Sequence, residues 1–218
     1  MNSCKNPIIF DGTMDAPVSN TVPEHTGFSM IKSHGGGVQK EKTYFKILPC
    51  EDRIYVGIKC LDPELAAKRQ AGDSSSTAYG GNCVELFLSP SGSNYEFYQF
   101  IVNMNGSTYT QYYSEGGNIR PDPYKPEWNH AVHIGTDSWS VEMEIPLTAF
   151  YWTPTALWND KWLVNITRNR VYGGSTQYST WSPLKFSFRE STNFNSLDGF
   201  PMRPAQDDVR IVSAVTDM

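Results

Sequence analysis

The alternation of apolar and polar residues is clearest between Asn82 and Gly106, where it predicts two β-strands joined by a tight connection. The strands are expected over 83–88 and 97–104, and the segment 89–94 between them, SPSGSN, consists of turn-forming residues. Successive side chains of a strand point to opposite faces of a sheet. One face of this hairpin is therefore expected to enter a core, while the other face carries charged and amide side chains.

The same period-two pattern recurs along the rest of the chain and predicts an all-β protein. A helix is expected at 63–70, after Asp62-Pro63, and a helical turn at 146–150. No repeat, linker or low-complexity tract interrupts residues 1–218, which predicts a single domain with the fold of an antiparallel, jelly-roll-like β-sandwich with long loops. Further strands are expected at 7–12, 28–31, 43–48, 54–61, 107–113, 131–134, 138–145, 162–170, 178–181 and 209–214.

Composition narrows the class of protein. A chain of 218 residues with 39% hydrophobic and 13% aromatic residues can bury one large core. The net charge of −5 and the lack of a basic cluster argue against a nucleic-acid surface. No apolar run approaches the ~20 residues of a membrane helix, and the N-terminus lacks the apolar core of a signal peptide.

The four cysteines show no CxxC spacing, so a zinc or dithiol redox site is not expected. Cys60 and Cys83 lie on predicted strands that could be antiparallel neighbours, although their side chains are expected to face different ways. A disulfide between them and two free buried thiols both stay open.

The second face of the central hairpin carries Glu85, Gln99 and Asn103 among aromatic neighbours. Such a mixture is unusual on a solvent-facing sheet, and an acid in an inner strand usually has a partner. It suits a sugar, because aromatic rings cover the apolar C–H face of a pyranose while carboxylates and amides bond its hydroxyls. Arg168 either reaches this face or caps a strand end.

The order of motifs along most of the chain resembles the family 9 carbohydrate-binding modules and their relatives. The most specific match is AYGGNCVELFLSP at 78–90 followed by YEFYQFIVNMNG at 95–106. The other matching segments are IIFDGTMD (8–15), EDRIYVGIKCLDPE (51–64), WSVEMEIPLTAF (139–150), KWLVNITRNR (161–170), STWSPL (179–184) and FRESTNFNSLDGF (188–200).

This resemblance implies a non-catalytic domain that recognises a saccharide, usually a terminal sugar clamped between two aromatic rings. By position the rings fall on Tyr79 and Phe188, the strand carboxylate falls on Glu85, and Lys185 occupies a position that often supplies an amide. The sequence departs from the family pattern at Gly81, where an aspartate is usual.

The resemblance further implies an extracellular or periplasmic protein that takes part in polysaccharide degradation, on its own or beside other modules of a larger glycan-degrading protein. Modules of this family carry structural calcium in loops, so calcium is compatible with the sequence, although no ligand set is identified. The oxygen ligands on predicted turns are Asp11, Asp15, Asp52 and Asp62.

Two other functions stay open from the residues. Related β-sandwiches hold b-type haem for electron transfer through a methionine and a histidine, and Met104, His130 and His133 are available here. A glycosidase would instead pair Glu85 with a second carboxylate across a cleft, and strand 138–145 carries two glutamates.

Overall fold

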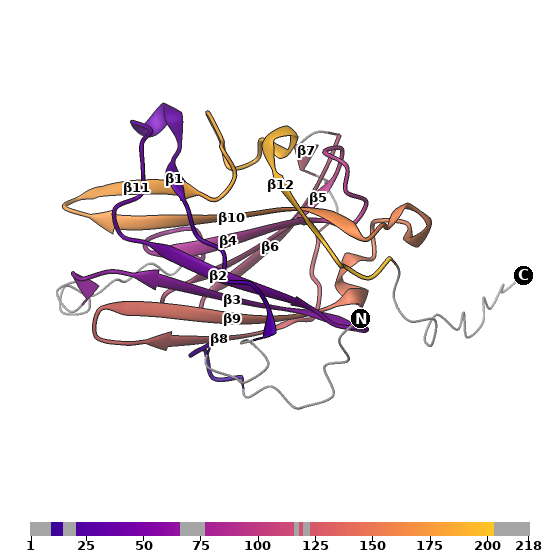
Figure 1. The fold of residues 1–218 in the computed structure, drawn as a ribbon, viewed down its shortest axis with the longest axis horizontal. Coiled ribbons are helices and arrows are strands. Elements are labelled where there is room, and N and C mark those ends of the chain that lie inside the picture. The colour runs from indigo at the N-terminus through magenta and orange to yellow at the C-terminus, as the bar shows by residue number, and fades with distance from the viewer. Residues whose placement is uncertain (1–9, 15–20, 66–76, 116–117, 120–122, 203–218) are drawn as a thin grey trace, which may run out of the picture.

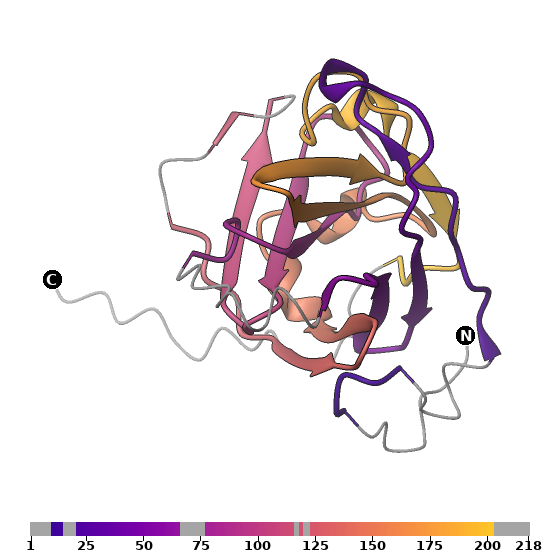
Figure 2. The same cartoon turned by 90° about the vertical axis from the view of Figure 1, so that its left-hand side faces the viewer.

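Two antiparallel β-sheets pack face to face in the computed structural model, which describes residues 10–14, 21–65, 77–115, 118–119 and 123–202 (Figures 1 and 2). The larger sheet has the strand order β1-β11-β10-β4-β5-β6-β7, with β12 pairing the beginning of β10, and the smaller sheet has the order β2-β3-β9-β8. The predicted all-β sandwich is therefore confirmed. No helix in the described part of the chain is long and apolar enough to cross a membrane.

The bounds of the elements follow the predicted pattern closely. The larger sheet consists of β1 (Ser29–Met30), β4 (Cys83–Ser89), β5 (Phe97–Asn103), β6 (Thr108–Ser114), β7 (Asn118–Ile119), β10 (Lys161–Tyr172), β11 (Ser175–Thr180) and β12 (Asn195–Asp198). The smaller sheet consists of β2 (Thr43–Pro49), β3 (Arg53–Leu61), β8 (Asn129–Ile134) and β9 (Ser138–Pro146). Single 3₁₀ turns are η2 (Lys32–His34), η3 (Leu147–Phe150), η4 (Thr155–Leu157) and η5 (Ser191–Asn193).

The core lies between the sheets and is built by the alternation that the sequence shows. Its members from the central hairpin are the predicted ones: Val84, Leu86, Leu88, Tyr98, Phe100, Val102 and Met104. The smaller sheet contributes the alternate residues of β3 and β9, and the tryptophans of 139, 158 and 162 are core residues as well. Burying these side chains, at about 25 cal/mol per Å² of apolar surface, is the main force that holds the layers together.

Three details differ from expectation or lie outside the described residues. The sequence predicts no strand at 195–198, because NSLD shows no apolar alternation, yet this segment forms β12 by pairing its backbone with 161–164. Residues 173–174, both glycines with positive φ, close a tight hairpin between β10 and β11, so β11 begins earlier than expected. The expected strand at 209–214, residues 7–9 of the expected strand at 7–12 and residues 66–70 of the expected helix at 63–70 lie outside the described residues, and residues 10–12 form no strand.

Of the two possibilities open for Cys60 and Cys83, a disulfide or two free thiols, the structure shows free thiols. Cys60 and Cys83 are both free and buried, and burial raises the pKa of each thiol. They belong to different sheets, which explains why their side chains do not meet. Cys50, in contrast, is disulfide-bonded.

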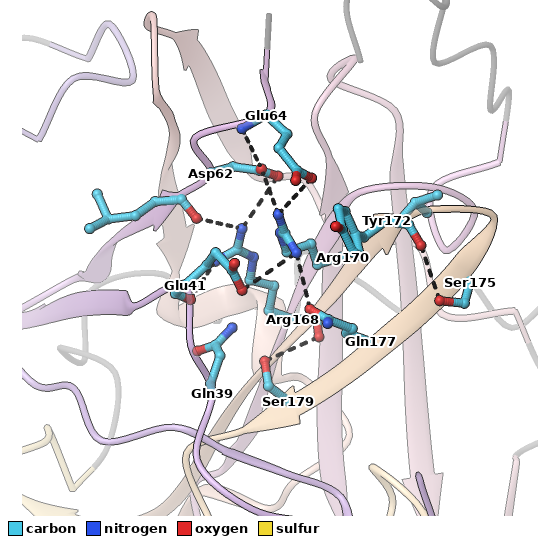
Figure 3. Close-up of polar contacts among 12 residues, drawn as sticks. Gln39, Glu41, Asp62, Glu64, Arg168, Arg170, Tyr172, Ser175, Gln177 and Ser179 are labelled. Atoms are coloured by element: carbon cyan, nitrogen blue, oxygen red, sulfur yellow. Dashed lines mark hydrogen bonds and ion pairs between the residues drawn. The ribbon is translucent and has the colours of Figure 1, made fainter. Parts of the chain in front are cut away.

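An ionic cluster lies where the chain leaves β3 and contacts β10 (Figure 3). The carboxylate of the fully buried Asp62 is 3.1 Å from Nη2 of Arg170 and 3.7 Å from Nη2 of Arg168. Arg170 also contacts Glu64 at 3.1 Å and Glu41 at 3.4 Å. Arg168 further donates to the backbone carbonyls of residues 61 and 41. Arg168 therefore joins the two sheets and does not reach the polar face of the central hairpin.

Gly92, in the turn between β4 and β5, is predicted to be the glycine most sensitive to substitution. Its φ of +64° is left-handed, and an added Cβ would collide with the backbone carbonyl of Lys161. Gly92→Ala should therefore cost at least about 2 kcal/mol of stability in urea unfolding. Gly174→Ala is the matched control, because its φ is +79° with open space around it, and only about 1 kcal/mol should be lost. Equal losses would contradict this prediction.

Candidate ligand-binding site

The outer face of the larger sheet, which points away from the core, carries the candidate site. The alternate residues of β4, β5, β6 and β10 lie on it, and loop residues cover its two ends. One end is closed by the apolar cluster of Ile31, Phe87, Phe97, Tyr113, Leu184 and Phe194, and the other by Ala78, Cys83 and Ile101. This cover explains why every residue of β4 and β5 is buried, including those on the polar face.

A pocket of about 290 Å³ opens between the sheet and the loops. The sheet contributes Glu85, Gln99, Tyr113, Asn169 and Tyr178, whereas the loops contribute Ile31, His34, Phe186, Ser187, Phe188 and Arg189. Three of the six residues expected from the sequence, Glu85, Gln99 and Phe188, thus line one pocket.

Glu85 and Gln99 form a hydrogen-bonded pair on the sheet side of the pocket. Gln99 Nε2 donates to Glu85 Oε2 at 2.6 Å, and the hydroxyl of Tyr113 donates to Gln99 Oε1 at 2.8 Å. These bonds fix the orientation of the amide and leave Glu85 Oε1 without a hydrogen bond to any described residue. Burial raises the pKa of Glu85 to about 7, against the opposing effects of Gln99 and Arg189.

Asn169 contributes a buried acceptor with no partner. Asn169 is only 6% exposed, and no described group donates to its Oδ1. Asn169 faces Cys83 of β4 in the sheet register, two residues along β10 from Thr167, which faces Glu85. A buried acceptor without a donor is costly, so this atom is suited to a ligand that brings a hydroxyl.

Aromatic side chains form the walls of the pocket. Phe188 packs edge-to-face on Tyr178 with 6.0 Å between ring centroids, and the ring of His34 is 4.6 Å from that of Tyr178. On the opposite side of the Glu85–Gln99 pair, Tyr113 stacks on Phe97 at 4.7 Å. Flat apolar walls around a polar floor are what the C–H face and hydroxyl edge of a sugar require.

The loop that carries Phe188 is held by Glu190. Its carboxylate accepts hydrogen bonds from the backbone N–H groups of Lys185, Phe186 and Ser187, and from the side chain of Asn193. These four bonds close the loop on itself and so place Phe188 and Arg189 beside the sheet.

The other expected residues lie elsewhere. Asn103 shapes the turn after β5, because its Oδ1 accepts from the backbone N–H groups of Asn105 at 3.0 Å and Ser107 at 2.8 Å. Tyr79 is 58% exposed and packs edge-to-face on Tyr109 at 5.8 Å, on the same outer face but outside the pocket. Lys185 is exposed on the loop and does not line the pocket either.

Sequence reasoning missed several residues of the pocket, Asn169 and Arg189 among them, and for Asn169 a signal was present. In the segment 161–170 the apolar residues 164 and 166 alternate with Asn165, Thr167 and Asn169, so the three polar residues share one face. That this face is also the face of Glu85 depends on β10 pairing with β4, which lie about 80 positions apart in the sequence. Such a long-range pairing cannot be read from the local pattern.

The arrangement does not support the two alternative functions. Glu142 and Glu144 lie on the outer face of the smaller sheet, on the far side of the core from Glu85, and so cannot share a cleft with it. Glu142 instead accepts from the backbone N–H of Gly12 at 2.8 Å. Two of the residues available as haem ligands have other contacts. Met104 is buried in the core, and Nε2 of His130 lies 2.9 Å from the carbonyl oxygen of Gly106.

The aspartates considered for calcium have other partners. Asp62 belongs to the ionic cluster, Asp52 pairs with Arg53 at 2.6 Å, and Asp11 accepts from the hydroxyl of Thr13 at 2.7 Å. Asp15 lies outside the described residues. Among the residues that are described, no three His, Cys, Asp or Glu side chains group as metal ligands do, and calcium binding by this chain stays a prediction.

Comparisons with known proteins identify the fold. A family 9 carbohydrate-binding module of Caldicellulosiruptor kristjanssonii, solved with cellotriose, matches with a TM-score of 0.62 over 96% of this chain and 96% of the other, at 15% identity. The chain has the fold of a family 9 carbohydrate-binding module. A module of that family from the same organism, solved with glucose, matches with a TM-score of 0.63 over 90% of this chain and 92% of its own length, at 17% identity.

A protein of Bacteroides uniformis ATCC 8492 to which carbohydrate binding has been ascribed shares the fold too. Its TM-score is 0.63, with 90% of this chain and 94% of that chain covered at 18% identity. The likeness to family 9 modules is one of structure: no protein-family model matches the sequence, and no curated protein matches it.

Proposed function

We propose that this chain is a non-catalytic carbohydrate-binding domain whose ligand occupies the pocket on the outer face of the larger sheet. The observation that carries the proposal is the partnerless Oδ1 of Asn169, buried beside the Glu85–Gln99 pair in a pocket with aromatic walls. The fold shared with family 9 modules solved with cellotriose and with glucose supports it.

Each part of a pyranose has a counterpart in the pocket. Phe188 covers a C–H face, which is worth about 1–2 kcal/mol on the basis of buried apolar area. A hydroxyl of the ligand donates to Asn169 Oδ1, and a second one bonds the free Oε1 of Glu85. Gln99, already bonded on both sides, orients the carboxyl of Glu85. Most of these bonds replace bonds to water, so the affinity is expected to be modest.

The size of the pocket favours one sugar residue. Its volume of about 290 Å³ is at the lower end of the range of ligand pockets, about 300–1,000 Å³. A terminal residue of a glycan therefore enters the pocket, and the rest of the glycan extends along the surface. Tyr79, exposed on the same face but outside the pocket, is then an outer contact for the next residues of the glycan.

Binding without turnover agrees with the carboxyl groups of the site. Glycoside hydrolysis requires two carboxyl groups across one cleft, and of the described residues Glu85 alone brings a carboxyl group to the pocket. The disulfide-bonded Cys50 supports an extracellular or periplasmic location, since disulfides persist in oxidising compartments. Such a domain would direct a glycan-degrading protein to its polysaccharide.

The test is a glycan-array screen followed by calorimetry on wild type, Phe188→Ala and Tyr79→Ala. Phe188→Ala should weaken binding about tenfold, because it removes a wall of the pocket. Tyr79→Ala should leave a monosaccharide unaffected and weaken only longer glycans, because Tyr79 lies outside the pocket.

Tyr151→Ala is the control, because this tyrosine is equally exposed but lies away from the pocket. If binding survived in Phe188→Ala and were lost in Tyr79→Ala, the binding site would lie at the other end of the sheet face, near Tyr79. Failure of every glycan to bind would contradict the proposed function.

A further inference from the structure

The mouth of the pocket carries an arginine without a carboxylate partner. The guanidinium of Arg189 lies 5.7 Å from the ring centroid of Tyr113, a cation–π contact, and its side chain is exposed. The other arginines in the described part of the chain, Arg53, Arg168 and Arg170, each pair with an aspartate. Arg189 also hydrogen-bonds the side chain of Tyr113, and since a guanidinium has five N–H donors, others remain for a group that enters the pocket.

The groups around Arg189 leave its charge uncompensated. Glu190, its neighbour in sequence, directs its carboxylate to the backbone N–H groups of its own loop. Glu85 is the remaining carboxyl group of the pocket, and because burial raises its pKa to about 7, it carries little charge in mildly acidic solution. The pocket is thus a cationic spot on a protein with a net charge of −5.

We propose that the sugar bound in this pocket carries a carboxylate, as a uronic acid does, and that Arg189 binds that carboxylate. This inference rests on the proposed function, since it names the class of sugar for the same pocket.

The chemistry of the arginine side chain supports this assignment. The planar guanidinium matches a carboxylate with two parallel hydrogen bonds, and charge-assisted bonds are about twice as strong as neutral ones. The contact with Tyr113 holds the guanidinium at the pocket mouth before the ligand arrives, so that less conformational freedom is lost on binding. The floor of the pocket supplies acceptors for hydroxyls, so the two ends of the pocket recognise different parts of the same sugar ring.

The experiment compares matched pairs of ligands by calorimetry: methyl glucuronide with methyl glucoside, and methyl galacturonide with methyl galactoside. Wild type at about pH 6 and low salt should bind one uronide about tenfold more tightly than its neutral partner. Arg189→Gln should abolish this preference, so that each uronide and its neutral partner bind with equal affinity. Raising the salt concentration should reduce the preference, because the site is open to solvent.

Lys185→Gln is the matched control, because Lys185 is an exposed cation of the same loop that does not line the pocket. This variant should keep the preference of wild type. Equal affinity of wild type for both members of each pair would overturn the inference and leave the proposed function intact. A preference that persists in Arg189→Gln would overturn the assignment of Arg189, whereas no binding of any of the four sugars to wild type would count against the proposed function itself.

Discussion

Replacing Asp62 with alanine is expected to lower the free energy of unfolding by about 3–5 kcal/mol. The carboxylate of Asp62 is fully buried and contacts both Arg168 and Arg170, whose side chains are also buried. Its removal leaves two guanidinium groups in the interior with part of their charge uncompensated, and a buried charge without its partner is far more costly than the pair. Urea unfolding followed by tryptophan fluorescence measures the loss.

Two further variants show whether the charge of Asp62 is responsible. Asp62→Asn keeps the volume and an acceptor for Arg170, so it should lose most of the same stability if charge dominates. Asp52→Ala removes the carboxylate from the exposed pair with Arg53 and should cost no more than about 1 kcal/mol. If Asp62→Ala lowered the free energy of unfolding as little as Asp52→Ala, water would compensate the charges of Arg168 and Arg170. The ionic cluster would then contribute little to the stability of the sandwich.

The strands could be predicted from the sequence where burial imposes a period of two. Val84, Leu86 and Leu88 must face the core, so the central hairpin and its two faces follow directly from the sequence. The short β12 shows no such alternation, because Leu197 is its one apolar residue, which packs against the core, and its backbone pairs with β10.

The residues of the candidate site likewise fall into two groups: those that the local sequence pattern predicts and those that depend on contacts between distant segments. Glu85 and Gln99 belong to one hairpin, so their shared face was visible in the sequence. Asn169 and Arg189 reach the pocket only through the β4–β10 pairing and through the loop that Glu190 closes. Asp62 was considered as a calcium ligand because a turn aspartate looks the same in sequence whether it binds a metal or an arginine more than 100 residues away.

Glu85→Gln is expected to change how the stability of the unliganded protein depends on pH. The folded protein holds the pKa of Glu85 at about 7, mainly through burial, against an ordinary value of 4.5. Between these values the folded state retains a proton that the unfolded state releases, so wild type loses stability as the pH rises from about 4.5 to about 7. The loss from this group amounts to about 3 kcal/mol.

Glutamine at position 85 keeps the acceptor for Gln99 Nε2 and has no proton to release, so Glu85→Gln should escape this loss. Relative to wild type it should therefore gain about 3 kcal/mol between about pH 4.5 and pH 8, as measured by urea unfolding at a series of pH values. The exposed Glu51→Gln is the control and should follow wild type at every pH. Parallel curves for wild type and Glu85→Gln would mean that Glu85 is already ionised in the folded protein at mildly acidic pH. The pocket would then hold a negative charge beneath Arg189, which would favour a neutral sugar over an acidic one.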